Sequence, residues 1–322
     1  MAKVVKRSRV KPQAVVKALE SGAVMMPLFG GCAVLGLNPK EIRERLGGAY
    51  RLVLPDALGL SGEIRQVLQK EAVAVLKDGE GLALGWEPFT EAMLKKVGAD
   101  LWFGLPGAGE EPEELMNDFG DWLKLVVIDK EWGLGPTVID FSGETPTVLR
   151  KGRLGILRLE AILRKRVRLG PGLYFSVLVV CTGNSCRSPI AAGLLVQELK
   201  GLPVVITSAG VAAPVGRQAT GNAINVAMEM GIDISGHRAR QLNKEMIDTA
   251  DLILVMETGQ RSWIVNLLPE ADVKVRLLGG YPEKEVEIPD PIGRSVEFYR
   301  QTALLIKAGV LKVTAELRER FK

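Results

Sequence analysis

The sequence predicts two α/β domains, the second a doubly wound parallel sheet. First, 322 residues, 47% of them hydrophobic, are enough for two domains of about 150 residues, each with a buried core. Second, apolar strands alternate with helical segments from residue 174 onward, which is typical of a parallel sheet with helices on both faces. Third, a basic segment followed by Gly170-Pro171-Gly172 marks a break between domains. We therefore expect domains at 1–168 and 174–322, joined by a linker at 169–173.

Charge and cysteine content narrow the class of protein. The net charge of +4 is mildly basic, which permits acidic partners without identifying nucleic acid as one. Three cysteines, Cys32, Cys181 and Cys186, are too few for a disulfide framework, so a cytoplasmic location is expected. No apolar run reaches the roughly 18 to 20 residues of a membrane span, so no membrane association is expected.

The first domain is expected to mix short strands and helices. Residues 1–11 form a basic arm, which we expect to be solvated and frayed. Apolar spacing and start signals predict helices at 12–21, 39–46 and 88–97. Short apolar runs predict strands at 23–28, 50–54, 72–76, 81–85, 101–104 and 123–128, with an acidic loop at 109–115. A hairpin is predicted from 135–141 and 146–152.

The second domain repeats strand and helix in turn. Strands are predicted at 174–180, 203–207, 252–256 and 273–277, and helices at 189–200, 220–230, 260–268 and from about 295 onward. In a sheet of this kind, ligands bind beyond the carboxyl ends of the strands.

The predicted strand 174–180 is followed directly by a cysteine, a residue type that can act as a nucleophile. Four β-favouring residues stop at Cys181, a Gly-containing loop follows, and Ser188 and Pro189 supply an N-cap hydroxyl and a proline at the first helical position. A loop closing on a helix N-terminus directs backbone N–H groups to one point, which favours an anion. Arg187 offers a bidentate fork to phosphate oxygens, and it favours a thiolate at Cys181. We expect a nucleophile there rather than a core hydrophobe.

Several segments of the second domain match one family. They are the Cys-x5-Arg-Ser pattern at 181–188, Ser208-Ala209-Gly210, His237-Arg238-Ala239-Arg240-Gln241, Ala250-Asp251-Leu252 and Asp290-Pro291. In this combination, residues 174–322 resemble the low-molecular-weight protein tyrosine phosphatases. The resemblance implies that Cys181 attacks phosphorus to form a phosphocysteine, while Asp290 protonates the leaving group and then activates water. Neither a metal nor a cofactor is expected, and the partner is a phosphoprotein substrate.

The resemblance also assigns the surrounding residues. Arg187 holds phosphate oxygens together with the loop residues Thr182, Gly183, Asn184, Ser185, Cys186 and Ser188. His237 supports the loop through Asn184 and Ser208. Taken without the resemblance, Asp290 before a proline is typical of a turn, and His237 is typical of an exposed turn. Cys186 either forms a reversible disulfide with Cys181 or is a buried neighbour.

Two positions bear on the substrate. A phosphotyrosine pocket needs aromatic walls, yet Ile292 stands where tyrosine phosphatases of this family usually carry tyrosine. Ser185 replaces a bulky isoleucine, and the related protein arginine phosphatases carry a small hydroxyl residue there. We therefore expect a protein arginine phosphatase, with a protein tyrosine phosphatase as the alternative. A thioredoxin-linked arsenate reductase needs further cysteines downstream, and none follows Cys186.

Residues 10–165 resemble, in outline, the threonylcarbamoyl-AMP synthase domains of the Sua5/YrdC type. The similarity lies in the predicted hairpin, the early helix and the first apolar strand. The family's Pro-Thr-x-Thr-x-Tyr-Gly-Leu segment has lost its polar residues at 27–37, and its Thr-Ser-Ala-Asn segment is replaced at 103–108. We expect a degenerate, non-catalytic α/β domain with a twisted sheet. The alternative is a synthase that uses a nucleotide and a tRNA partner.

Overall fold

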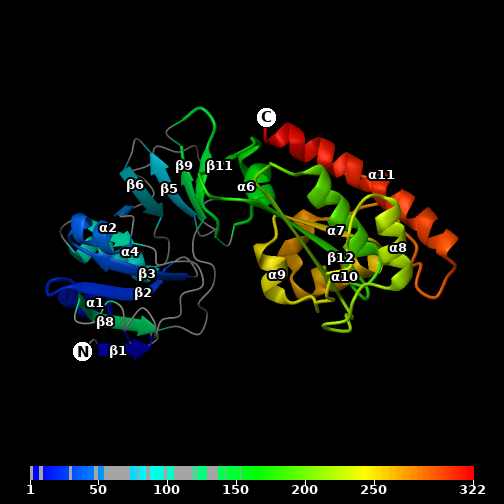
Figure 1. Ribbon diagram of the computed structural model, residues 1–322. Coiled ribbons are helices and arrows are strands. Elements are labelled where there is room, and N and C mark those ends of the chain that lie inside the picture. The colour runs from blue at the N-terminus through cyan, green and yellow to red at the C-terminus, as the bar shows by residue number, and fades with distance from the viewer. Residues whose placement is uncertain are drawn as a thin grey trace. The chain divides into compact units, whose positions relative to one another are not determined.

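The structure is a computed structural model that describes residues 3–6, 10–28, 31–46, 50–53, 73–77, 80–84, 88–97, 100–104, 119, 122–128, 137–141, 143–152 and 154–322. The chain divides into two compact units, residues 1–173 and 174–322 (Figure 1).

The first unit is built on one mixed sheet with the strand order β1-β8-β2-β3-β7-β4-β6-β5-β9-β10-β11. The strands are β1 (Lys3–Lys6), β2 (Ala23–Leu28), β3 (Gly31–Gly36), β4 (Tyr50–Val53), β5 (Val73–Lys77), β6 (Glu80–Leu84), β7 (Leu101–Gly104), β8 (Leu123–Ile128), β9 (Thr137–Asp140), β10 (Thr147–Arg150) and β11 (Arg168–Leu169). The helices are α1 (Pro12–Leu19), α2 (Pro39–Leu46), α4 (Pro88–Val97) and α6 (Ile156–Leu163).

Around β2, the sheet has a buried apolar core on each of its two faces. Val24 and Met26 of β2 pack against α1 and α4, whereas Met25 between them points to the opposite face with Val34 and Val126. Successive residues of a strand point to opposite faces, so one continuous apolar strand serves two cores.

The predicted strands and helices of this unit are confirmed to within a few residues at their ends. The expected frayed arm is wrong in part, because Lys3–Lys6 forms β1 and pairs in parallel with β8. Strand β3 was not predicted, and it pairs antiparallel with β2. The acidic segment 109–115 and residues 105–108 lie outside the described residues. Leu169, at the start of the expected linker, belongs to β11, which pairs with β10.

The second unit has a four-stranded parallel sheet in the order β13-β12-β14-β15. The strands are β12 (Phe175–Cys181), β13 (Val204–Gly210), β14 (Leu252–Val255) and β15 (Val275–Leu277). The helices are α7 (Arg187–Glu198), α8 (Gly221–Glu229), α9 (Lys244–Thr249), α10 (Thr258–Leu267), the 3₁₀ helix η4 (Pro269–Lys274) and α11 (Val296–Arg320). The predicted parallel sheet is confirmed, while α9 was not predicted.

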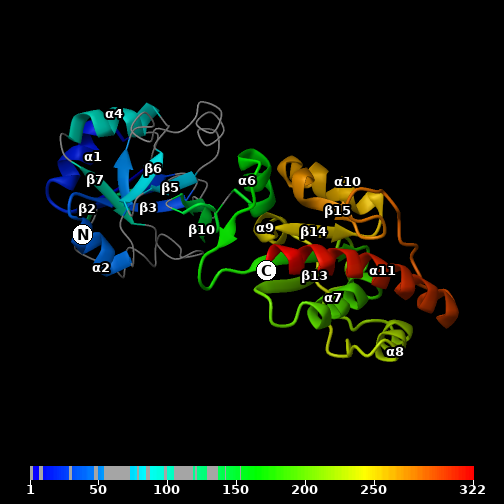
Figure 2. The ribbon, with the colours of Figure 1, turned by 90° about the horizontal axis from the view of Figure 1, so that it is seen from above.

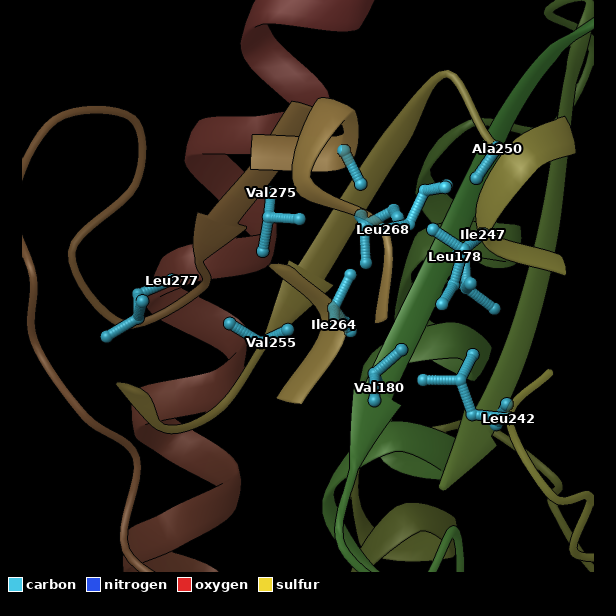
Figure 3. Close-up of a cluster of buried hydrophobic side chains, with 13 residues drawn as sticks. Leu178, Val180, Leu242, Ile247, Ala250, Val255, Ile264, Leu268, Val275 and Leu277 are labelled. Carbon is cyan, nitrogen blue, oxygen red and sulfur yellow. The ribbon is translucent and has the colours of Figure 1, made fainter. Parts of the chain in front are cut away.

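Helices cover both faces of this sheet. Helices α7, α8 and α11 lie on one face, and α9, α10 and η4 lie on the other (Figure 2). Leu178 and Val180 of β12 point toward α9 and α10, where Ile247 and Ile264 meet them in a buried cluster (Figure 3). Because side chains alternate along a strand, the other two valines of β12, Val177 and Val179, point to the opposite face, toward α7. Both are buried.

The position of Cys181 follows from this pairing. Strand β12 lies between β13 and β14, and its last residue, Cys181, pairs with Gly210 at the carboxyl end of β13. Loops that follow β12, β13 and β14 therefore meet at one edge of the sheet. Within the part of the chain that the structure describes, no helix is both long enough and apolar enough to traverse a bilayer.

Candidate active site

Cys181 ends β12 with a buried side chain, and two groups contact its sulfur. Its Sγ lies 3.0 Å from Ser188 Oγ and accepts a hydrogen bond from the backbone N–H of Asn184 at 3.2 Å. Both Ser188 and Asn184 lie where the loop turns into α7. A hydroxyl, a backbone N–H and a helix N-terminus all favour a negative charge on this sulfur.

Asn184 is the centre of the loop's hydrogen-bond network. Its φ of 50° lies in the left-handed region, which asparagine adopts more readily than most residues. Its Nδ2 donates to Ser188 Oγ at 2.9 Å and to Ser208 Oγ at 3.0 Å, and its Oδ1 accepts from the backbone N–H of Arg240 at 2.9 Å. One buried amide thus joins the loop to β13 and to the segment after α8.

His237 also binds the loop at Asn184, through a hydrogen bond to its backbone. Its Nε2 lies 2.7 Å from the carbonyl oxygen of Asn184. Burial lowers the pKa of His237, and the positive charges of Arg240 and Arg238 lower it further. The imidazole is therefore neutral near pH 7, and its Nε2–H donates to the carbonyl.

Arg187 is a fully buried cation at the first turn of α7. Its Nη1 donates to Glu257 Oε1 at 2.7 Å and to the carbonyl oxygen of Ile288 at 2.9 Å, and its Nη2 donates to Asp290 Oδ2 at 2.6 Å. Within the described chain, its buried Nε has no hydrogen-bond partner. The guanidinium thus connects α7 with the loops after β14 and β15, and its Nε–H is available to an anion.

Asp290 lies next to Arg187, whereas Ile292 is exposed to solvent. Asp290 Oδ1 accepts the backbone N–H of Ile292 at 3.2 Å, so both carboxylate oxygens are hydrogen-bonded. Ile292 is 58% exposed. It leaves the rim of this site without an aromatic wall at that position.

The loop's far side is formed by Ser185 and Cys186, which face α8 and α11. The Ser185 carbonyl accepts a hydrogen bond from the backbone N–H of Thr220 at 2.9 Å. Cys186 Sγ lies 3.4 Å from Thr220 Oγ1 and 3.5 Å from the hydroxyl of Tyr299. Cys181 and Cys186 are both free thiols.

The second unit is similar in sequence to proteins of known activity. Residues 176–322 match the family of the low molecular weight phosphotyrosine protein phosphatases. The protein-arginine-phosphatase of Geobacillus stearothermophilus is 44% identical over 128 residues, which cover 39% of this chain and 84% of that protein. A solved structure of the YwlE arginine phosphatase from the same species is 38% identical, covering 45% of this chain and 94% of that one, with a TM-score of 0.43.

A tyrosine phosphatase is also similar to this chain. The low molecular weight protein-tyrosine-phosphatase Ptp of Acinetobacter johnsonii is 40% identical over 142 residues, which cover 44% of this chain and 97% of that protein. The chain belongs to the low molecular weight phosphotyrosine protein phosphatase family. It is therefore a cysteine-dependent phosphoprotein phosphatase.

Two site residues of this phosphatase were missed by sequence reasoning. Glu257 and Gln260 follow β14, and Gln260 Nε2 donates to Thr182 Oγ1 at 3.2 Å and to Glu257 Oε2 at 2.9 Å. Both lie at the carboxyl end of a parallel strand, and that position is the signal that could have identified them. In the described part of the phosphatase, no group of three His, Cys, Asp or Glu side chains is arranged to hold a metal ion.

Proposed function

We propose that this phosphatase acts on phosphoarginine in proteins, with Cys181 as nucleophile and Asp290 as general acid. The observation that carries the substrate assignment is Ser185, a small hydroxyl residue buried in the phosphate loop. A bulky residue at this position fits a planar phenyl ring, whereas a hydroxyl offers a hydrogen bond to a guanidinium N–H. The solvent-exposed Ile292 supports the same proposal, because it supplies no aromatic wall.

The chemistry proceeds in two steps. The Cys181 thiolate attacks phosphorus, the S–P bond forms, and the P–N bond breaks as Asp290 gives its proton to the leaving guanidine nitrogen. Water then attacks the phosphocysteine, Asp290 takes a proton from that water, and the S–P bond breaks to release phosphate. Arg187 and the N–H groups of the loop stabilise the charge on the equatorial oxygens in both steps.

The hydrogen bonds around the sulfur support this assignment. Ser188 Oγ, 3.0 Å from Cys181 Sγ, stabilises the thiolate both before attack and as the leaving group of the second step. Asn184, Ser208 and His237 act by holding the loop, because their hydrogen bonds go to loop atoms. The remaining loop residues Thr182, Gly183, Ser185 and Cys186 present backbone N–H groups to the phosphoryl oxygens.

The test is a comparison of kcat/KM for three peptides of one sequence carrying phosphoarginine, phosphotyrosine or phosphoserine. We expect phosphoarginine to be the best substrate, and Cys181→Ser to abolish turnover of all three. A preference for phosphotyrosine would select the alternative, a tyrosine phosphatase, for which the relative from Acinetobacter johnsonii provides support.

Substitution of Ser185 tests the selecting role directly. Ser185→Ile should lower the ratio of the phosphoarginine kcat/KM to the phosphotyrosine kcat/KM by about tenfold or more, as expected when one pocket contact is replaced. Ser185→Ala should lower that ratio less, because it removes the hydroxyl without filling the pocket. A ratio unaffected by Ser185→Ile would exclude Ser185 as the selecting residue.

For residues 1–168 we propose a degenerate Sua5/YrdC-like domain without synthase activity, joined through 169–173 to the phosphatase domain at 174–322. The loss of polar residues across 27–37 supports this, since a triphosphate site needs cations and hydroxyls. The test is threonylcarbamoyl-AMP formation from ATP, bicarbonate and threonine by the full-length protein. We expect none, and product formation would instead favour a nucleotide and tRNA partner.

We further propose a cytoplasmic location. The two thiols of the phosphate loop are free, and a cysteine nucleophile works in a reducing compartment.

A further inference from the structure

Three side chains from separate parts of the chain meet behind the phosphate loop. Thr220 Oγ1 donates to the hydroxyl of Tyr299 at 3.2 Å, and both oxygens lie within 3.5 Å of Cys186 Sγ. Thr220 precedes α8, and Tyr299 is in the first turn of α11. We call these three residues the rear cluster.

The rear cluster contacts Ser185 at two points. The Ser185 carbonyl accepts the backbone N–H of Thr220 at 2.9 Å, and Ser185 Oγ lies 3.6 Å from Cys186 Sγ. Ser185 therefore receives its position from the same residues that bind the neighbouring cysteine. Its own side chain has no other hydrogen-bond partner among the contacts of the described chain.

Further contacts hold the hydroxyls of the rear cluster in place. Thr220 is the N-cap of α8, where its Oγ1 accepts the backbone N–H of Ala223 at 3.3 Å. Tyr299 is 2% exposed, and burial together with the Cys186 hydrogen bond raises its pKa to about 12. The phenol thus stays protonated, accepts from Thr220 and shares a hydrogen bond with Cys186 Sγ. Helices α8 and α11, which contact each other, hold the two hydroxyls in register.

The opposite side of the loop has a separate support. Cys181 is held by Ser188 and Asn184, and Asn184 by Ser208 and Arg240, none of which bonds to the rear cluster through its side chain. Loss of a rear hydroxyl should therefore shift Ser185 more than it shifts the sulfur.

We propose that Thr220 and Tyr299 are positioning residues that fix Ser185 and thereby set which phosphorylated side chain the enzyme prefers. This inference rests on the proposed function, because it takes Ser185 as the residue that contacts the substrate beyond its phosphoryl group. The two hydroxyls do not touch substrate, and they act through Ser185 and Cys186.

The experiment uses the full-length protein and matched phosphoarginine and phosphotyrosine peptides. The selectivity ratio is the phosphoarginine kcat/KM divided by the phosphotyrosine kcat/KM. Tyr299→Phe and Thr220→Val should each lower it by about fivefold, the effect of one lost buried hydrogen bond. Thr220→Ser keeps the hydroxyl and should retain the wild-type ratio. The inhibition constant of inorganic phosphate should change less than the selectivity ratio in these variants, because Arg187 and Cys181 are held by contacts outside the rear cluster.

Thr302→Val is the matched control. Thr302 lies one turn after Tyr299 on α11, and its hydroxyl is buried without a hydrogen-bond partner in the described chain. This variant should keep the wild-type ratio. If Tyr299→Phe does not fold, the selectivity ratios of Thr220→Val and Thr220→Ser test the inference on their own.

An unchanged ratio in Tyr299→Phe and Thr220→Val would overturn the inference, and so would equal falls of both kcat/KM values, since these indicate a purely structural role. The failure of the proposed function has a different signature. In that case the wild-type enzyme prefers phosphotyrosine, while the variants still report whether the rear cluster alters the ratio.

Discussion

Asp290 accepts hydrogen bonds at both carboxylate oxygens, from Arg187 and from the N–H of Ile292, and asparagine has the same size but keeps one of these two acceptors. Asp290→Asn cannot protonate a leaving group, and kcat should fall by about 10²- to 10⁴-fold on phosphoarginine peptides. With p-nitrophenyl phosphate the fall should be smaller, because nitrophenolate leaves without a proton. Steady-state kinetics with both substrates provide the measurement, and equal falls would contradict the acid role.

His237 makes stability depend on pH. Its pKa is lowered in the folded protein, chiefly by burial, whereas an unfolded histidine titrates near 6.5. The folded state therefore binds fewer protons, and its stabilisation is complete above about pH 6.5 and is lost as pH falls through the folded pKa. Urea unfolding at stepped pH values should show this loss. His237→Gln retains an N–H donor, and its stability should vary less with pH over this range.

Single residues of the site differ in how far the sequence predicts them. Cys181, Arg187 and Ser188 lie within one short segment, and their spacing around a strand end and a helix start indicates a phosphate loop. Glu257 meets Arg187 only because β12 and β14 are neighbours in the sheet. Contacts of this kind depend on strand order, which no local pattern contains.

At the level of elements, the close approach of β13 to the phosphate loop demands glycine at position 210. A Cβ there would lie 2.6 Å from the carbonyl oxygen of Thr182 and 2.8 Å from the backbone nitrogen of Asn184. Gly210→Ala should therefore displace the loop, costing about 1–3 kcal/mol of unfolding free energy and most of the activity. Urea unfolding and phosphopeptide turnover measure the two effects. Gly236→Ala, which meets no atom within 4 Å, is the control expected to behave as wild type.

The elements that sequence reasoning missed share a physical cause. Strand β1 is short and half lysine, and it becomes a strand only by pairing with β8 far along the chain. Strand β3 continues the apolar run of β2 without a polar turn between them, so the periodicity does not separate the two. Strands β12 and β14 were predictable because each is an apolar run bounded by its own turn and helix signals.

In the whole molecule, every site residue described above belongs to the second unit. Residues 174–322 expressed alone should retain kcat/KM on phosphoarginine peptides within about threefold of the full-length value, because such a unit carries its own core. The relative from Acinetobacter johnsonii matches this region over 97% of its own length. Kinetics of the truncated protein, with Cys181→Ser as the inactive control, provide the test. An inactive but folded fragment would mean that residues 1–173 complete the site.

Because β12 pairs with a strand on each side, we expect the two sides of the site to differ in how readily they open. Cys181 ends the sheet's interior strand, whose amide hydrogens we expect to exchange slowest in this unit, whereas Asp290 follows an exposed segment, 282–287, which we expect to open locally. We therefore expect Cys181 to be held in place before the substrate binds, and we expect the segment that carries Asp290 to be the part of the site that moves during turnover.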